Sequence, residues 1–249
     1  MSGVKKIAWV ILALALCMMI ISGRRLQAVR QTYREGDENY ARLTERVRPQ
    51  SLPISEAPGS SIDIPDLQID FAALGEVNPD AVAWLYGPDT AIDYPVMQAT
   101  DYDYYLHHLP DGTYNANGAL FIDYNWKDFT DELTVVYGHN MKSGRMFGSL
   151  TQYKKQPYFE AHPYLYLYTA ENKNYRIDLI YGCVIKAGQW RERAFTFKEN
   201  LDALLAYAAH NTTFVSDAQY SPGDKVIALA TCSYEFDDAR YVVLGILRS

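Results

Sequence analysis

Cys232 and Arg240 are the residues whose types and spacing most directly suggest chemistry. Cys232 closes an apolar run over residues 225–232, and Arg240 stands immediately before a second apolar run over residues 241–247. Two strands joined by the seven residues between them would place a thiol and a guanidinium at the same end of a sheet. Because the thiolate is the reactive form of cysteine and nearby positive charge favours it, this arrangement suits a nucleophilic cysteine.

A histidine that could serve as the base lies 93 residues before the cysteine, at His139. Residues 133–137 are rich in β-branched side chains and predict a strand, and Gly138 marks the turn that follows. A cysteine, a histidine and a third group, distant in sequence and adjacent in space, form the general pattern of a thiol acyl-transfer site. Taken alone, such a histidine is usually a hydrogen-bonded turn residue, and such an arginine is usually a surface charge.

Several ordered motifs around these residues resemble the sortases, and among them class B. They extend from about residue 69 to the C-terminus, and so many matches in order argue against chance. The matching segments are residues 137–141 (Tyr-Gly-His-Asn-Met), 146–150 (Met-Phe-Gly-Ser-Leu), 229–236 (Leu-Ala-Thr-Cys-Ser-Tyr-Glu-Phe), 239–243 (Ala-Arg-Tyr-Val-Val), 78–84, 92–96, 105–106 and 118–123.

The resemblance implies a membrane-anchored cysteine transpeptidase that cleaves a C-terminal sorting signal of the form Asn/Ser-Pro-x-Thr-Gly/Asn after the threonine. Cys232 would attack the threonyl carbonyl and Arg240 would stabilise the oxyanion. His139 would protonate the leaving amine and later deprotonate the incoming one. The thioacyl intermediate would pass to an amine of a lipid-linked peptidoglycan precursor, which attaches a surface protein to the cell wall. This chemistry requires no cofactor.

The resemblance also implies a substrate groove around the cysteine. Two positions depart from the class B pattern: Ala230 stands where serine is frequent, which removes a hydroxyl that could bond the substrate, and Tyr102 stands where asparagine is common. Both changes affect the groove and leave the three catalytic candidates intact. The expected substrate-binding residues are Leu106, Asn140, Thr231, Ala230, Tyr102 and Phe195, and residues 189–197 are expected to line the groove.

From residue 62 onward, short apolar runs alternate with Gly, Pro, Asn and Asp, which predicts the short strands of a β-barrel or sandwich. The 21 tyrosines of the chain fit half-exposed strands better than helices. Helices are expected over residues 71–77, 79–85 and 198–210. The resemblance narrows the fold class to mainly β: a closed sortase-type barrel of about eight strands, with N-terminal helices and a helix in the connection before the cysteine strand.

The N-terminal segment predicts a membrane anchor. Residues 7–21 carry no charge, and a helix over residues 7–23, flanked by lysines before and arginines after, could just span a bilayer. A cleaved signal peptide is the alternative, but no good small-x-small cleavage site follows, and bulky Leu16 argues against a lipoprotein site at Cys17. Basic residues flank both ends, so charge alone does not fix the orientation. The resemblance implies a short cytoplasmic tail over residues 1–6 and a catalytic domain outside the membrane of a Gram-positive-type bacterium.

Residues 24–61 are expected to form a stem before a single catalytic domain over residues 62–249. Residues 24–48 are charge-rich with apolar side chains at helical spacing, and residues 49–61 hold three prolines with serine and glycine, which indicates a flexible spacer. We favour a solvated helix here. The alternative is a helix packed on the catalytic domain, as class B members typically show.

The remaining cysteines and histidines have ordinary interpretations. Cys183 lies inside an apolar run and is predicted to be a small buried residue, although the cysteine count also allows a disulfide with Cys232. His107 and His108 would point to opposite faces of a strand, so no metal site is predicted. The net charge of −7 and the lack of a basic stripe exclude a nucleic-acid partner.

Two other classes of function share these features. A thiol hydrolase that releases the intermediate to water would use the same three residues, and only an amine-dependent product separates it from a transpeptidase. A non-catalytic, membrane-anchored β-domain would have Cys232 buried or disulfide-bonded. The sequence favours the transpeptidase, with surface proteins, the peptidoglycan precursor and the membrane as its partners.

Overall fold

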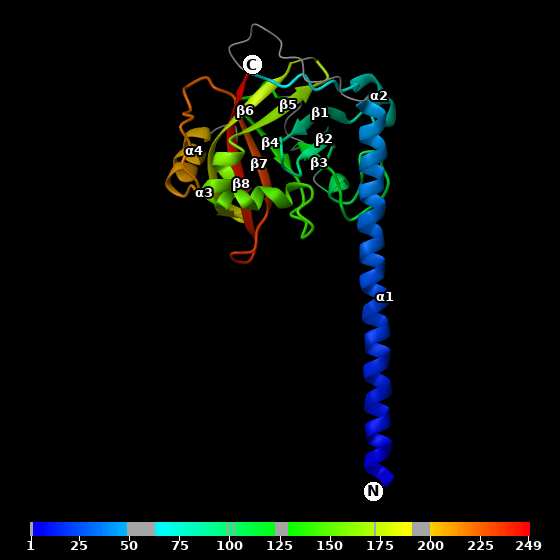
Figure 1. Ribbon diagram of the computed structural model, residues 1–249. Helices are drawn as coiled ribbons and strands as arrows, with labels where there is room; N and C mark the ends of the chain where they lie inside the picture. Colours follow the sequence, from blue (N-terminus) through cyan, green and yellow to red (C-terminus); the bar gives the residue numbers. More distant parts are fainter. Residues whose placement is uncertain are drawn as a thin grey trace.

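A closed barrel of eight strands forms the body of the protein, in the order β1-β2-β3-β4-β7-β8-β6-β5 (Figure 1). The computed structural model describes residues 2–48, 63–98, 100–101, 103–122, 129–171, 173–190 and 200–249. The prediction of a mainly β, closed barrel is confirmed. The strands are β1 (Ala81–Tyr86), β2 (Asp93–Gln98), β3 (Leu120–Ile122), β4 (Leu133–Tyr137), β5 (Tyr164–Thr169), β6 (Tyr175–Lys186), β7 (Val226–Cys232) and β8 (Ala239–Arg248).

Strands β7 and β8 are buried on both faces, which explains why their sequences are apolar without alternation. In β8, Tyr241 and Val243 pack in the largest core cluster, whereas Val242 and Leu244 belong to a second cluster on the opposite face. Helix α4 (Leu201–His210) covers this second cluster with four of its side chains. The predicted helix before the cysteine strand is therefore confirmed.

The two short helices predicted after residue 70 have different outcomes. Helix α2 (Phe71–Val77) is confirmed, and the side chain of Asp70 caps it by accepting a 2.9 Å hydrogen bond from the Ala73 backbone N–H. The helix predicted over residues 79–85 is wrong, because that segment forms β1, which pairs with both β2 and β5. Three consecutive residues of β1 are fully buried, so the segment lacks the alternation by which a strand is usually recognised.

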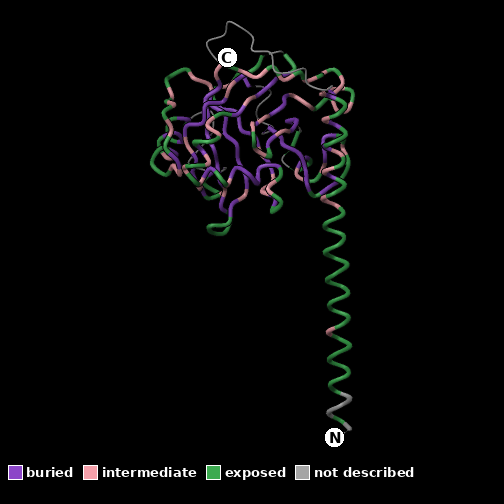
Figure 2. Tube along the Cα trace, in the orientation of Figure 1, coloured by how far each residue is buried: buried purple, intermediate pink, exposed green. Residues whose placement is uncertain are grey.

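Helix α1 (Ser2–Val47) is continuous and has two different halves. Its N-terminal half extends away from the barrel as a single exposed helix (Figures 1 and 2). Its C-terminal half packs on the barrel and buries Tyr40, Leu43 and Val47. The expectation of a solvated stem is therefore wrong for this half, and the packed alternative holds. The predicted flexible spacer over residues 49–61 lies outside the described residues.

Three short helices lie in the connections between β2 and β3 and between β4 and β5. The 3₁₀ helix η1 (Tyr104–Leu106) lies between β2 and β3. The 3₁₀ helix η2 (Phe147–Lys154) and helix α3 (Gln156–Ala161) lie between β4 and β5. Through these connections, Leu106 and the segment that follows His139 reach the same end of the barrel as the cysteine.

Candidate active site

Cys232 and Arg240 are direct cross-strand partners in the antiparallel pair of β7 and β8. Strand β4 runs parallel to β7 with Tyr137 opposite Ala230, so His139 leaves β4 at the edge where β7 ends. Cys232 is the last residue of β7, His139 follows the end of β4, and Arg240 lies near the start of the antiparallel strand β8, so all three lie at the same edge of the sheet. All three line one cavity of about 210 Å³. The structure thus brings together a thiol, an imidazole and a guanidinium.

The His139 ring is oriented by a backbone carbonyl. Its Nε2 atom lies 2.7 Å from the carbonyl oxygen of Leu106. Because a carbonyl can only accept, Nε2 carries the proton in this hydrogen bond, and in the neutral ring Nδ1 is left as the basic nitrogen. Leu106 therefore takes part in the site through its main chain as well as through its side chain, which lines the cavity.

The Arg240 guanidinium has hydrogen-bonding capacity to spare. Its Nη1 atom donates to the carbonyl oxygen of Ala239 at 3.1 Å, and within the described residues it forms no ion pair. A guanidinium carries five N–H donors in a planar fork, which suits it to bind a developing oxyanion. The side chain is only half buried and lines the cavity beside Cys232.

Two side chains hold the ends of β4 and β7 together. Asn140 donates through Nδ2 to the carbonyl oxygen of Cys232 at 2.8 Å, and Thr231 donates through Oγ1 to the carbonyl oxygen of Gly138 at 2.7 Å. Both bonds connect the histidine segment with the cysteine strand. The structure therefore gives Asn140 and Thr231, predicted to bind substrate, a role in fixing the separation of His139 and Cys232.

The cavity contains part of the predicted groove. Leu106, Ala230 and Thr231 line it as expected. Tyr102 and Phe195 lie outside the described residues, so their assignment stays a prediction. Apart from Trp190, the other wall residues were not predicted to line the groove. Two of them, Phe121 and Tyr137, are cross-strand partners on β3 and β4 with ring centroids 5.5 Å apart, so their proximity follows from strand pairing. These other wall residues are Asp103, Phe121, Tyr137, Gly138 and Trp190, of which only Trp190 falls in the segment expected to line the groove.

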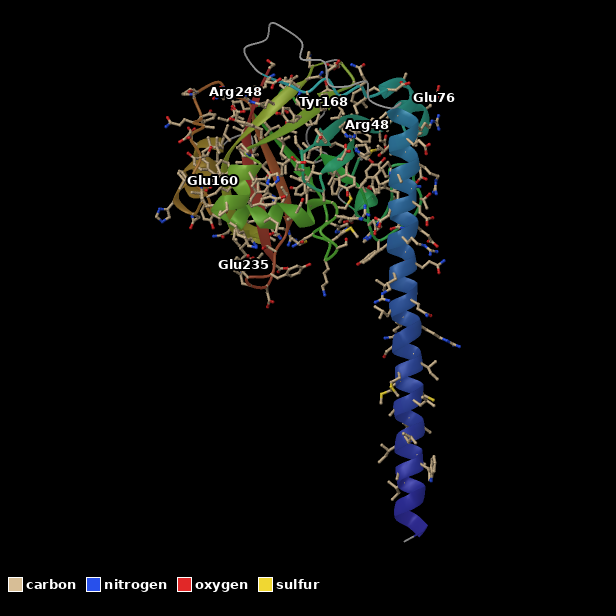
Figure 3. All side chains as sticks on the ribbon, in the orientation of Figure 1. Arg48, Glu76, Glu160, Tyr168, Glu235 and Arg248 are labelled. Atoms are coloured by element: carbon tan, nitrogen blue, oxygen red, sulfur yellow. The ribbon has the colours of Figure 1, made fainter. Side chains whose placement is uncertain are left out.

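A polar cluster supports the connection between Cys232 and Arg240. Lys154 donates through Nζ to Ser233 Oγ at 2.8 Å, pairs with the carboxylate of Glu235 and lies 4.8 Å from the ring centroid of Tyr241. Burial alone would raise the pKa of Glu235, but hydrogen bonds from Lys154 and Ser233 outweigh it and lower that pKa. Figure 3 shows Glu235 in this connection, at the opposite end of β8 from Arg248. This cluster borders a second cavity, of about 480 Å³, which Asn140 also lines.

Cys183 does not belong to this site. It is fully buried under α4, and burial raises its pKa to about 12. Cys183 and Cys232 are both free, so the disulfide that the cysteine count allowed is not formed. The prediction of a small buried residue is confirmed.

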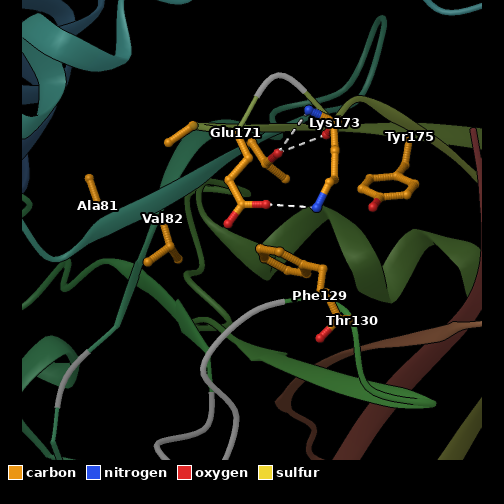
Figure 4. A pocket seen from close by; sticks show the side chains of 9 residues that line it. Ala81, Val82, Phe129, Thr130, Glu171, Lys173 and Tyr175 are labelled. Atoms are coloured by element: carbon orange, nitrogen blue, oxygen red, sulfur yellow. Dashed lines mark hydrogen bonds and ion pairs between the residues drawn. The ribbon is translucent and has the colours of Figure 1, made fainter.

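Another cavity, of about 180 Å³, lies where β1 and β6 begin (Figure 4). Its polar wall includes Glu171 and Lys173, which form an ion pair at 2.8 Å. None of the three catalytic candidates lines it. It offers no chemistry comparable with the thiol site.

Comparison with known proteins gives a consistent picture. No family model matches the sequence. The chain is 34% identical to the Sortase B of Listeria monocytogenes over 185 residues, which are 72% of this chain and 74% of that protein. The structure of Clostridium perfringens sortase B superposes with a TM-score of 0.65 at 30% identity, over 72% of this chain and 100% of that chain. Sortase B from Bacillus anthracis superposes with a TM-score of 0.72 at 27% identity, over 88% of this chain and 99% of that one.

Proposed function

Because the chain belongs to the class B sortases, which are cysteine transpeptidases of the Gram-positive cell wall, we propose that Cys232, His139 and Arg240 perform its acyl transfer. The observation that carries this proposal is the cross-strand pairing of Cys232 with Arg240 in a cavity that His139 also lines. A nucleophile, an acid–base group and an oxyanion donor are the groups that such a reaction needs. Among the cysteines and histidines of the described residues, only Cys232 and His139 line this cavity.

The reaction has two halves. The Cys232 thiolate attacks the threonyl carbonyl carbon of a sorting signal, and Arg240 donates hydrogen bonds to the oxygen as it becomes negative. Protonated His139 gives its Nδ1 proton to the leaving amine, the C–N bond breaks and a thioester forms. An acceptor amine then attacks the thioester and loses a proton to His139. The new amide is released, and Cys232 returns to its thiolate state.

The substrate is a surface protein with a sorting signal of the Asn/Ser-Pro-x-Thr-Gly/Asn type, and the acceptor is an amine of a lipid-linked peptidoglycan precursor. The mostly apolar wall around Leu106 and Phe121 suits the proline and the neighbouring side chains of such a signal. Ala230 supplies no hydroxyl, so the signal would be held by main-chain and apolar contacts at this position.

The apolar half of α1 anchors the enzyme as a single-pass helix with the barrel outside the cell. This half is long and apolar enough to cross a membrane, by length and composition, and it makes no contact that buries it. Its exposed side chains include Trp9, Leu12 and Ile20, which are unfavourable in water. Signal and acceptor both lie at the outer membrane face, so anchoring raises their effective concentration.

Mass spectrometry of the full chain in detergent tests this function. The protein is incubated with Asn/Ser-Pro-x-Thr-(Gly/Asn) peptides, with and without triglycine as the amine, and Cys232→Ala serves as the control. We expect cleavage after threonine, a thioacyl adduct on Cys232 and its conversion to an amide when the amine is present. Cleavage with no amide product would instead establish a hydrolase, and absence of cleavage with an unreactive Cys232 would establish a binding domain.

A further inference from the structure

The packed half of α1 contacts the turn that supports the His139 ring. Tyr40 is 7% exposed, and its hydroxyl donates to the carbonyl oxygen of Gly118 at 2.7 Å. Gly118 has a φ of +59°, and a Cβ added to it would lie 3.0 Å from His139 Cδ2 and 2.9 Å from the carbonyl oxygen of Leu106. That carbonyl is the acceptor for His139 Nε2. Tyr40 is therefore hydrogen-bonded to Gly118, which lies next to both the His139 ring and the Leu106 carbonyl that orients this ring.

The same helix also fixes the segment on the other side of His139. Asp37 pairs with Arg145 at 2.9 Å, and Tyr40 packs edge-to-face on Tyr94 with ring centroids 5.1 Å apart. The Tyr94 hydroxyl accepts from the backbone N–H of Met146 at 3.3 Å. Residues 146–147 pack back against the histidine segment. Met146 forms an antiparallel β-bridge with Asn140, and the Phe147 N–H donates to the carbonyl oxygen of His139 at 3.0 Å.

A close contact with the Gly118 turn sets the position of the helix. Asn115 and Asn117 are 4% and 1% exposed, and their amides donate to the backbone carbonyls of Thr32 at 3.0 Å and Tyr33 at 3.3 Å. Such an approach requires Gly36, because a Cβ at this position would lie 2.1 Å from Asn117 Nδ2. Gly36 therefore allows the helix to approach the turn closely enough for both hydrogen bonds.

We propose that residues 32–40 of α1 are a positioning element for His139, with Tyr40 as its central positioning residue. The helix that carries the anchor and the loops that hold the histidine form one packed unit. Docking of the stem consequently sets the orientation of the imidazole, and the chain transfers acyl groups at full rate only when the stem is docked. This inference rests on the proposed acid–base role of His139.

A pair of glycine substitutions in full-length protein tests the proposal. Gly36→Ala inserts a methyl group against Asn117, whereas Gly23→Ala, on the same helix, meets nothing within 4 Å. Both substitutions replace glycine by alanine in the same helix and raise intrinsic helix propensity, so the control accounts for the propensity effect. For Gly36→Ala we expect kcat for transpeptidation to fall by about tenfold or more, with the peptide KM changed less than about twofold, because the ring is misplaced while the groove is intact. Gly23→Ala keeps the wild-type values.

A pH profile separates positioning from general destabilisation. In Gly36→Ala the limb of the kcat–pH profile that depends on His139 should shift, since its ring loses its fixed environment, while the melting temperature of the barrel shows whether the fold is retained. If Gly36→Ala fails to fold, Tyr40→Phe, which removes only the hydroxyl bond to Gly118, decides the question by the same two measurements. Wild-type kcat and pH profile in the folded variants overturn the proposal. An inactive wild-type chain would instead overturn the proposed function.

Discussion

The two thiols of the barrel lie on β6 and β7, which both pair with β8, but one thiol is buried in an apolar core and the other is partly exposed beside a guanidinium. Cys183 of β6 is paired with Val242 of β8, and Cys232 of β7 is paired with Arg240, two residues away along β8. Cys183 is inside its strand and fully buried beneath α4, whereas Cys232 is the last residue of its strand and half exposed. The position of a cysteine along its strand therefore decides whether it faces an apolar core or a guanidinium at an open edge.

The comparison teaches that residue type alone does not make a nucleophile. A thiol surrounded by aliphatic side chains keeps its proton because the thiolate loses its hydration there, which raises the pKa of Cys183 to about 12. A thiol at a strand end can be reached by substrate and has room for a cationic partner. The predictions below test this difference, starting with the largest effect.

Replacement of each cysteine by alanine should separate the two thiols most clearly. Cys232→Ala should lower the rate of thioester formation and transpeptidation by roughly 10⁴-fold or more, since no other thiol among the described residues lines the cavity. Cys183→Ala should leave activity within about twofold and lower the free energy of unfolding by about 1–2 kcal/mol through lost packing. Peptide cleavage assays and urea unfolding of the full-length variants measure both effects. A Cys232→Ala variant that still forms an adduct would exclude Cys232 as the nucleophile.

Removal of the cationic partner should make the environment of Cys232 more like that of Cys183. Arg240→Ala should lower kcat by about 10²–10³-fold, because the oxyanion loses its donors. Arg240→Lys should recover only part of this, since an ammonium keeps the charge and loses the planar fork. Arg248→Ala is the matched control on the same strand, where Arg248 Nη1 pairs with Asp224 at 2.6 Å, far from the thiol. Equal losses in the Arg240→Ala and Arg248→Ala variants would contradict an oxyanion role.

Loss of the Lys154 contacts to the segment between Cys232 and Arg240 should show how far the open edge of the sheet must be held in place for Cys232 to react. Lys154 holds Ser233 and Glu235, which follow Cys232 directly. Lys154→Met should lower kcat/KM by about tenfold, because the connection that carries Cys232 and Arg240 loses its anchor. The ammonium of the neighbouring Lys155 donates to Gln152 Oε1 at 3.3 Å and, within the described residues, forms no bond to the connection, so Lys155→Met should keep the wild-type value. Iodoacetamide labelling of Cys232 followed by peptide mapping reports the same change without a substrate, and identical labelling in both variants would argue against the anchor.

The smallest effect concerns Cys183 in alkaline solution. The folded state keeps the Cys183 proton to about pH 12, whereas the unfolded chain releases it near pH 9, so this group stabilises the fold fully below pH 9 and progressively less as the pH rises to 12. The free energy of unfolding of the wild type relative to Cys183→Ala should fall by about 2 kcal/mol between pH 8 and 10.5, which cancels or reverses the advantage that the wild type has at pH 8. Urea unfolding at the two pH values measures it, with Cys17→Ala, outside the barrel, as the control. A constant difference would mean that the Cys183 thiol is not desolvated.

Local patterns predicted the elements that carry the site. The run over residues 133–137 is bounded by Glu132 and Gly138, and the structure has β4 over the same residues. The prediction of a helix over residues 79–85 was wrong because Ala83, Trp84 and Leu85 are buried on both faces of β1, so no alternation of apolar and polar residues marks the strand. Trp84 also donates to Asp93 of β2 at 2.7 Å, a contact between strands that no local pattern contains.

The sequence by itself indicated the candidate catalytic residues, because an apolar run that ends in cysteine, another that begins after arginine and a third that ends before histidine predict three strand ends that carry them. The resemblance to class B sortases follows from the same residues. Only the tertiary structure decided that Asn140 and Thr231 hydrogen-bond the ends of β4 and β7 to each other. It also decided that Lys154 binds Ser233, 79 residues away in the chain, and that the stem packs beside His139. These contacts join segments far apart in the chain, and they depend on packing geometry that leaves no periodic signal in either segment.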